Sequence, residues 1–443
     1  MRQTLQSCIV FLGFWTTLVV QPAAARQQTE GLTLREAVMI ALEHNAQVLQ
    51  AKESQIGAEA RISESQSGLL PVVNVQASYA RVGPVASYTV AIGPMFPPIT
   101  MKFGVENMYS TGLSVQHSLF NWGRTQAGID ISEAGARMSQ SGVDLARQSA
   151  AYQIIQLFYG IVVSKEAIDV QDQGIRSLES RLEILKKRYD AGLVSNFDVL
   201  TMEVQIASLR SRRIDAAGNL AKLRSLFNRF LGRDVTTPVV LNGELQHEVQ
   251  SLKRTDLLEQ AKARRSELEQ LRHQEAMSQA QVNLSNSFDK PSVNLSLMWG
   301  LRNGYMPNLD VLRGNWNGGI VLAYPLFDGF KTKSQVEQAE VNVRLAQMRY
   351  DDVKSAIELE IQQNLIDLEA NELKIQIEKA KVQQAEEALR IADERYARGL
   401  VSTTDLLDSQ TSLENAKLNL LQATYSAIIA RYSLDKAMGI RPY

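Results

Sequence analysis

Few side chains of this sequence have the types and spacing that catalysis requires. Glu358 and Glu360 are two residues apart in a helical stretch, so they point in different directions and suit a solvated face better than an acid–base pair. We find no phosphate loop, nucleophile elbow or zinc-binding helix motif. The four histidines are scattered, at His44, His117, His247 and His273. The sequence therefore predicts a protein that is not an enzyme and that has neither a cofactor nor a metal site.

The N-terminus has the layout of a cleavable secretory signal, which we predict for residues 1–25. Arg2 precedes an apolar run from Cys8 to Val20, and three alanines follow at 23–25. An uncleaved membrane anchor is the alternative, but this run of 13 residues is shorter than the ~20 that a spanning helix needs. Cys8 is the single cysteine, so the mature chain is predicted to have no thiol. The net charge of −1 predicts no nucleic-acid partner.

The rest of the chain is a tandem duplication. Segment 188–200 returns 207 positions later as 395–407, with eight of thirteen residues identical. Upstream, 70–75 pairs with 290–295 at an offset of 220, so the first half holds 13 extra residues. The chain is therefore expected to divide into three parts: a first repeat over 26–232, a connector over 233–251 and a second repeat over 252–443.

Each repeat holds two segments in which apolar residues alternate with small or polar ones, the pattern of β-strands. These segments are about 72–82, 112–120, 292–302 and 317–327. About ten residues are enough for a tilted strand to cross a bilayer. A soluble sheet packed on helices would show the same alternation. However, Trp122, Trp299 and Trp316 lie in or beside these segments, as expected for the aromatic belts of a membrane protein, so we predict transmembrane strands.

Long helices are predicted after each pair of strands. Helical periodicity runs without a credible breaker from about 122 to 189 and from about 329 to 396, which gives helices on the order of 100 Å long. Gly192 and Gly399 end these helices. A returning helix follows each glycine, and this completes helical hairpins over 122–231 and 329–438.

The predicted fold class is mainly α with transmembrane β, and it requires several copies of the chain. Four strands cannot close a barrel, and an open sheet edge in lipid would leave backbone groups unpaired. Two copies would give eight strands and an interior filled by side chains, whereas three would give twelve strands and a lumen. We therefore predict a homotrimer that forms a duct.

Over essentially the whole mature chain, the sequence resembles the TolC-like outer-membrane efflux family. The resemblance rests on the helix that begins Leu34-Arg35-Glu36-Ala37, on Leu326-Phe327-Asp328-Gly329-Phe330, and on Tyr-x-x-Gly-Leu-Val-Ser segments beginning at Tyr189 and Tyr396. It implies a trimeric 12-stranded barrel in the outer membrane of a Gram-negative bacterium, continuous with a helical tunnel that extends into the periplasm. It also implies a passive exit duct for efflux or type I secretion.

The resemblance further implies partners and roles for the hairpin tips. The partners are outer-membrane lipid, a periplasmic adaptor protein and an inner-membrane pump of the RND, ABC or MFS type. Asp405 and Asp408 match an acidic ring at the narrow mouth, where carboxylates favour cations. The alternative for Asp405 is a helix cap that complements the helix dipole. Tyr396 and Asp198 match a pair that ties neighbouring hairpins shut, and Tyr189 is the counterpart of Tyr396 in the first tip.

Two further features of the tips bear on closure and docking. Gly192-Leu193 and Gly399-Leu400 match the motif that family members offer to the adaptor. Their alternative role is a C-cap glycine with a leucine packed on the helix end. Val401 departs from the family, because the best-known member has an arginine there that helps to latch the tip. The latch of this chain is therefore predicted to be weaker or differently wired.

A soluble periplasmic coiled-coil adaptor is the main alternative to an outer-membrane duct. Such a protein also has long helical hairpins and belongs to the same export systems. It would need a lipoyl-like or barrel domain between the arms of its hairpin, and it would not need alternating strands flanked by tryptophan. The sequence therefore favours the duct.

Overall fold

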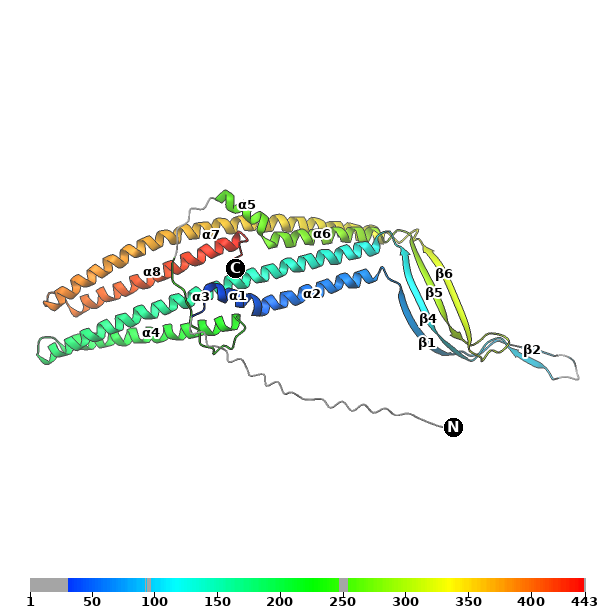
Figure 1. The fold of residues 1–443 in the computed structure, drawn as a ribbon, viewed down its shortest axis with the longest axis horizontal. Coiled ribbons are helices and arrows are strands. Elements are labelled where there is room, and N and C mark those ends of the chain that lie inside the picture. Colours follow the sequence, from blue (N-terminus) through cyan, green and yellow to red (C-terminus); the bar gives the residue numbers. More distant parts are fainter. Residues whose placement is uncertain (1–30, 92, 94–96, 247–253, 442–443) are drawn as a thin grey trace, which may run out of the picture.

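The computed structural model describes residues 31–91, 93, 97–246 and 254–441. The predicted signal, 1–25, lies outside these residues, as does the end of the predicted connector. The described chain is elongated, with helices at one end and a sheet at the other (Figure 1). None of the helices in this part of the chain combines the length and the apolar character needed to cross a bilayer.

The duplication is visible in the lengths of the helices. The first repeat contains α3 (Arg124–Asp190) and α4 (Asn196–Phe230), and the second contains α7 (Lys331–Ala397) and α8 (Thr403–Ala437). Both long helices have 67 residues and both returning helices have 35. Shorter helices precede the strands of each repeat: α1 (Leu34–His44), α2 (Ala46–Ser67), α5 (Arg254–Arg264) and α6 (Ser266–Asn286).

Four long strands form one antiparallel sheet in the order β1-β4-β5-β6. They are β1 (Val72–Arg81), β4 (Asn107–Phe120), β5 (Ser292–Arg302) and β6 (Arg313–Ala323). The extra residues of the first repeat form the short hairpin of β2 (Ser87–Val90) and β3 (Ile99–Lys102), which projects beyond the sheet (Figure 1). The prediction of a mainly helical chain with four long strands is confirmed.

Two predicted strand limits are corrected by the structure. The second strand starts at Asn107 and not near 112, because Asn107 pairs with Arg81 at the far end of β1. The fourth strand runs from Arg313 to Ala323 and does not reach 327. Pro325 follows soon after its end, and proline has no N–H to give to a neighbouring strand. The alternation at Tyr324 and Leu326 therefore continues past the end of the hydrogen-bonded ladder.

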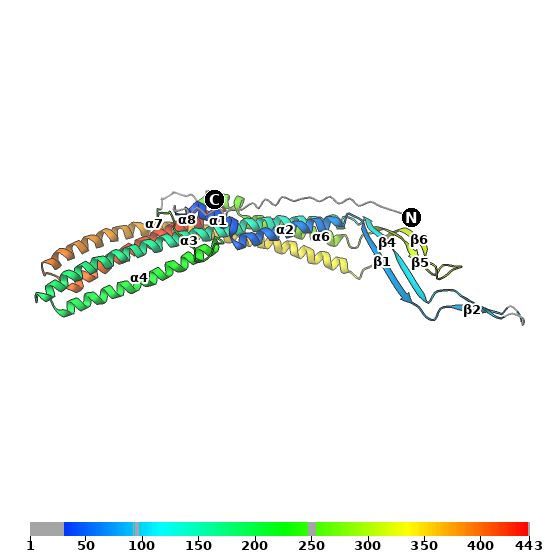
Figure 2. The same ribbon diagram turned by 60° about the horizontal axis from the view of Figure 1, so that its bottom comes forward.

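The strands and the long helices form a single curved layer, and Figure 2 shows this layer more nearly edge-on. Each strand adjoins a helix: α2 precedes β1, β4 precedes α3, α6 precedes β5 and β6 precedes α7. Next to the sheet, the helices contact one another in the order α2-α3-α6-α7. Near the tips the order is α4-α3-α8-α7. One lateral edge of the layer is therefore β1, α2 and α4, and the other is β6 and α7.

Each long helix begins at a turn with two successive left-handed residues. These are Trp122 and Gly123 in the first repeat (φ 52° and 77°), and Gly329 and Phe330 in the second (φ 70° and 63°). The offset of 207 aligns the two turns, with glycine and aromatic residue exchanged. A left-handed conformation costs an aromatic residue roughly 1–2 kcal/mol. Both repeats nevertheless keep this turn at the junction of strand and helix.

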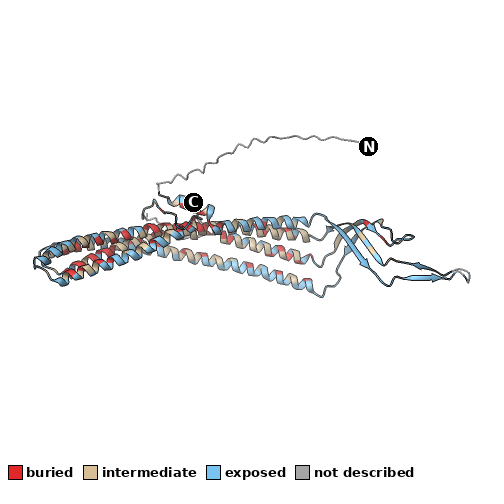
Figure 3. Ribbon diagram, turned by 90° about the horizontal axis from the view of Figure 1, so that it is seen from below, coloured by how far each residue is buried: buried red, intermediate tan, exposed pale blue. Residues whose placement is uncertain are grey.

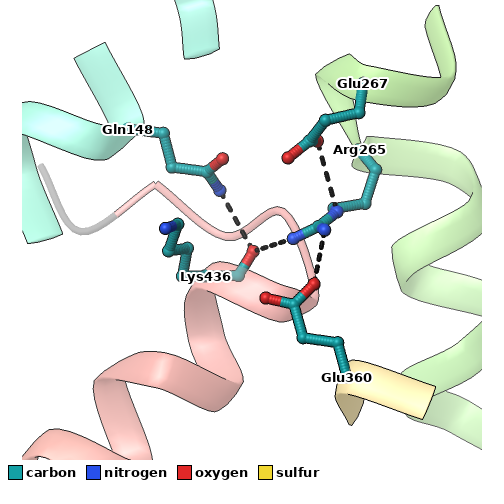
Figure 4. A network of polar contacts seen from close by, with 5 residues as sticks. All are labelled: Gln148, Arg265, Glu267, Glu360 and Lys436. Carbon is teal, nitrogen blue, oxygen red and sulfur yellow. Dashed lines mark hydrogen bonds and ion pairs between the residues drawn. The ribbon is translucent and has the colours of Figure 1, made fainter. Parts of the chain in front are cut away.

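A polar joint connects the two hairpins to the helices of the sheet end. Arg265, the residue before α6, donates through Nη1 to the carbonyl oxygen of Lys436 at 3.1 Å and through Nη2 to Glu360 Oε2 at 2.6 Å. Its Nε lies 3.2 Å from Glu267 Oε2, and Gln148 Nε2 donates to the same Lys436 carbonyl (Figure 4). Arg265 thus caps the end of α8 and holds it in line with α6.

The first repeat has a matching joint. Asn45 caps α2 and donates through Nδ2 to the carbonyl oxygen of Phe230 at 3.3 Å, at the end of α4. The main apolar core lies at this level, where Phe158 and Phe227 are fully buried beneath α1. Buried residues form narrow stripes along the helices, and much of the sheet is exposed (Figure 3).

Candidate functional site: the paired hairpin tips

The two hairpin tips have nearly the same backbone. Gly192 (φ 71°) and Gly399 (φ 73°) adopt the left-handed conformation that ends a helix. Leu193 N donates to the Arg188 carbonyl at 2.9 Å, and Leu400 N to the Arg395 carbonyl at 3.0 Å. These bonds satisfy the last carbonyl groups of α3 and α7. The glycines are thus helix caps, while Leu193 and Leu400 are 73% and 69% exposed.

Capping boxes begin both returning helices. Ser195 Oγ donates to Asp198 Oδ2 at 2.6 Å, and Ser402 Oγ to Asp405 Oδ2 at 2.7 Å; each serine oxygen accepts the backbone N–H of its aspartate in return. These hydrogen bonds from Ser402 lower the pKa of Asp405 below its ordinary value. Asp405 is therefore a helix cap, and its exposed position leaves the carboxylate able to act on ions as well.

Asp408 has no such structural role among the described residues. It is exposed, lies three residues after Asp405 on α8, and has no hydrogen-bonding or ionic partner in the described part of the chain. Side chains three apart in a helix share a face. The structure therefore brings the two carboxylates to one side of the second tip, where neither is neutralised by a cation.

The two tips meet at a groove of about 670 Å³ lined by residues of both hairpins. Thr403, which is 4% exposed, lies between the predicted closure residues. Its Oγ1 is 3.3 Å from the Tyr396 hydroxyl. The side chain of Ser195 is the largest cause of the lowered pKa of Asp198, and the side chain of Thr403 is a smaller cause in the same direction. Tyr396 and Asp198 are thus joined through Thr403 within one chain, whereas Tyr189 is largely exposed and does not line the groove.

Arg188 provides a second link across the groove. Its Nη2 donates to the Ala397 carbonyl at 3.3 Å, and its guanidinium carbon lies 5.8 Å from the centre of the Tyr396 ring. Val401 also lines the groove and offers no polar group. Position 401 therefore carries no cation in this chain; Arg188 of the first hairpin and Arg398 of the second line the groove instead, and Arg188 reaches across it. Neither Thr403 nor Arg188 was predicted from the sequence.

Farther from the tips, in the seam where the two hairpins of one chain pack against each other, Arg181 joins α3 to the second hairpin. Its Nη2 donates to Asp393 Oδ2 of α7 at 2.7 Å, and its Nη1 donates to Gln410 Oε1 of α8 at 2.8 Å. Leu407 of α8 packs in an apolar cluster with Leu185 and Met202 of the first hairpin. The hairpins of one chain are therefore held together by both polar and apolar contacts.

Thr403→Val is expected to loosen the tips, because it removes the hydroxyl group between Tyr396 and Asp198 while retaining the shape of the side chain. A hydrogen bond of this kind contributes about 1 kcal/mol, which corresponds to about fivefold in an equilibrium. Single-channel recordings in planar bilayers should show more frequent opening. The matched control is Thr404→Val, at the exposed neighbouring position. An opening frequency equal to that of the wild type would show that Thr403 is not part of the closure.

Comparison with known proteins identifies the family. Residues 37–231 and 257–440 match the outer membrane efflux protein family. The chain is 20% identical to the outer membrane protein TolC of Escherichia coli (strain K12) over 406 residues, which covers 89% of this chain and 80% of TolC. It is 23% identical over 314 residues to protein CyaE of Bordetella pertussis, which covers 67% of this chain and 65% of CyaE.

Solved structures show the same fold. The CmeC outer membrane channel of Campylobacter jejuni superimposes with a TM-score of 0.78 at 19% identity, over 92% of this chain and 85% of CmeC. The open state of the MtrE outer membrane channel of Neisseria gonorrhoeae gives 0.74 at 18% identity, over 92% and 89%. The predicted resemblance and outer-membrane location are confirmed, and a soluble adaptor is not favoured. The chain belongs to the outer membrane efflux protein family.

Proposed function

We propose that three copies of this chain form one closed duct, a twelve-stranded barrel continuous with a helical tunnel, through which cargo leaves passively. The observation that carries the proposal is that, among the described residues, both edges of the sheet are unpaired and apolar faces of the edge helices are exposed. In the sheet, β1 and β6 each pair with one neighbour. An outer-membrane strand with an unpaired edge would leave backbone N–H and C=O groups in lipid without partners. Pairing β6 of one copy with β1 of the next satisfies both edges.

The edge helix α7 has a second apolar stripe that the described part of its own chain leaves exposed. At ~100° per residue, this stripe lies roughly opposite the buried one that packs on α8. The buried stripe includes Ile361, Leu368 and Ile375. The exposed stripe consists of Val341, Leu345, Met348, Leu359, Ile366, Leu373, Ile377 and Ile391. A helix that is apolar on two opposite faces fits between two neighbours, so we infer that another copy covers the second face.

The opposite edge carries a complementary apolar surface. On α4, residues that include Val204 are exposed on the side away from the buried Met202, Ile206 and Leu209. On α2, the exposed residues Leu49 and Ile56 are seven positions apart and so lie on one face of the helix. On the helices of this edge, the exposed large apolar residues are Leu49, Ile56, Phe197, Leu200, Val204, Ile214 and Leu226. In a ring of copies, this edge meets α7 of the neighbour. Two copies would give only eight strands and a filled interior, so three is the smallest number that leaves a lumen.

The state of assembly tests this proposal directly. The mature protein, purified in detergent, should have the mass of three chains in sedimentation equilibrium, and it should conduct ions when reconstituted in planar bilayers. A monomer that stays soluble without detergent would refute the proposal.

At the tips, we propose that Asp405 and Asp408 of three copies form the acidic ring of the mouth. Tyr396, Asp198 and Thr403 would hold the hairpins together, and Tyr189 would contribute to closure of the first tip. The exposed Gly192-Leu193 and Gly399-Leu400 would contact a periplasmic adaptor, which joins the duct to an inner-membrane pump of the RND, ABC or MFS type. Docking would then separate the hairpins by exchanging one packed arrangement for another.

Asp405→Asn with Asp408→Asn is expected to lower the cation preference of the channel several-fold. Asparagine removes the charge but keeps an oxygen that can accept the capping bond from Ser402. Because the pKa of Asp405 lies below its ordinary value of 3.8, the wild-type preference should persist down to that pH and disappear only below it. Reversal potentials in asymmetric salt measure the ratio of cation to anion permeability. The control is Asp367→Asn on α7, and an unchanged reversal potential in the double variant would exclude the ring.

A further inference from the structure

Glu414 of α8 is a buried carboxyl group with no partner for either oxygen. The residue is 3% exposed, and neither Oε1 nor Oε2 has a hydrogen-bond donor among the described residues. An ionised carboxylate in such a place costs several kcal/mol unless it is paired. Glu414 lies in the seam between the hairpins, on the same helix as Gln410, which Arg181 of α3 binds. Its burial therefore depends on the packing of one hairpin against the other.

Gly174 of α3 lies next to this carboxyl group. A methyl group at Gly174 would lie 3.9 Å from Glu414 Oε2 and 4.0 Å from Leu209 Cδ1 of α4. These are ordinary van der Waals distances, so α3, α4 and α8 are closely packed around the carboxyl group.

Gln171 of α3 has another acceptor oxygen that forms no hydrogen bond among the described residues. Gln171 is one turn before Gly174, is 8% exposed, and has a buried Oε1 without a donor in the described part of the chain. The seam at this level thus contains three buried acceptor oxygens that form no hydrogen bond among the described residues. A proton on Glu414 would supply one donor and would remove the buried negative charge at the same time.

The charged groups of the surrounding helices leave Glu414 without a close counter-ion. Arg212 of α4 is the cation whose charge acts on it, but Arg212 is exposed and makes no hydrogen bond to it. Among the described residues, four pairs of charged groups around the seam neutralise one another. These pairs are Asp172 with Arg213, Glu179 with Arg210, Arg181 with Asp393, and Glu386 with Lys417. Burial, opposed only in part by Arg212, raises the pKa of Glu414 above its ordinary 4.5.

We propose that Glu414 is a proton-dependent lock of the seam between the two hairpins, protonated while α8 packs against α3 and ionised once the helices separate and water reaches it. The lock acts on the hairpin separation proposed above and rests on that part of the proposed function. Acidification then favours the packed seam, and opening of the seam releases one proton per chain.

The pH dependence follows from the direction of the shift. A group whose pKa is raised in the packed state stabilises that state fully below its ordinary pKa of 4.5. This stabilisation is lost as the pH rises from 4.5 to the higher pKa of the packed state. Across that interval, the ratio of separated to packed seams is expected to rise by up to ~10-fold per pH unit.

A distance measurement across the seam tests the lock in the intact protein. The mature sequence lacks cysteine, so spin labels can be placed on the exposed positions Gln173→Cys of α3 and Ser412→Cys of α8. Assembly with an excess of unlabelled chains leaves one labelled chain per complex. Pulsed EPR between pH 4.5 and 8 should show a growing population of longer distances in the wild type. In Glu414→Gln the short distance should persist at every pH.

The controls separate the lock from other causes. Glu414→Leu, a second neutral variant, should also be insensitive to pH, whereas Glu369→Gln at an exposed position of α7 should behave as the wild type. The proposal is overturned if the wild-type distances do not change with pH, or if Glu414→Gln changes in parallel with the wild type. Because the labels report on one chain, this result is independent of the mass that tests the trimer.

Discussion

Ile366→Asp combined with Leu373→Asp is expected to convert the assembled protein into monomers. Both residues lie in the exposed stripe of α7, opposite the stripe that packs on α8. If a neighbouring copy covers this face, assembly would bury two unpaired carboxylates at each interface. The effective cost is on the order of several kcal/mol per buried charge, so the closed ring should be lost. Sedimentation equilibrium in detergent would then give the mass of one chain, and bilayers would show no conductance.

The polar flank of the same helix offers a matched control. Gln376 is exposed and lies about a quarter turn away from the stripe, so Gln376→Asp adds the same charge outside the proposed interface. This variant should assemble as the wild type does. A double variant that still sediments as three chains would show that the α7 stripe faces solvent or lumen and not another copy. Circular dichroism at 222 nm would confirm that the monomers retain their helices.

Arg265→Ala is expected to release the end of α8 from the joint. The arginine side chain is 6% exposed and holds the Lys436 carbonyl, Glu360 and Glu267 together. Removing one partner from a buried ionic network costs about 3 kcal/mol, at the lower end of the usual range here because both glutamates are partly exposed. Amide hydrogen exchange in the last turn of α8 and the first turn of α6 should accelerate by about 100-fold.

An exposed arginine of the same region provides the comparison. Arg272 of α6 donates to the Tyr350 hydroxyl at 3.1 Å and lies over the Tyr350 ring, but it is a surface residue. Arg272→Ala should change exchange rates little, since exposed polar contacts contribute only about 0–1 kcal/mol. If both variants exchange at the wild-type rate, the joint is held by its apolar neighbours, among them Leu434 and Met438. If exchange accelerates equally in both variants, the loss of either arginine destabilises these helix ends and the joint has no special role.

The regular elements could be predicted because their signals are local. Alternation, helical periodicity, and the two glycine tips repeat at fixed offsets, and each sets a backbone conformation within a few residues. Strand limits were less certain, since they depend on the partner strand. Asn107 belongs to β4 because Arg81 extends opposite it, and Tyr324 is excluded from β6 although the alternation continues there. Pairing, not pattern, decides where a strand ends.

In the hairpin tips, the sequence indicated residues of the repeated tip motif but not the contacts that form only when the two hairpins pack together. Asp198 and Asp405 are three residues after a serine, so their capping role is visible in the sequence. Thr403 follows the second tip directly, and nothing marks it as the link between Tyr396 and Asp198. Arg188 belongs to the repeated motif, yet its position over Tyr396 arises only when the two tips meet.

The amino-acid sequence by itself determined the duplicated plan of strands and long helical hairpins, because backbone preferences and amphipathic periods act over one or two turns. Tertiary structure decided which helices lie side by side, and with them the open edges of the layer, the joint at Arg265 and the buried Glu414. Those features arise between residues that are tens to hundreds of positions apart. Their environments exist only after packing has removed water from around them, and no local pattern records that loss.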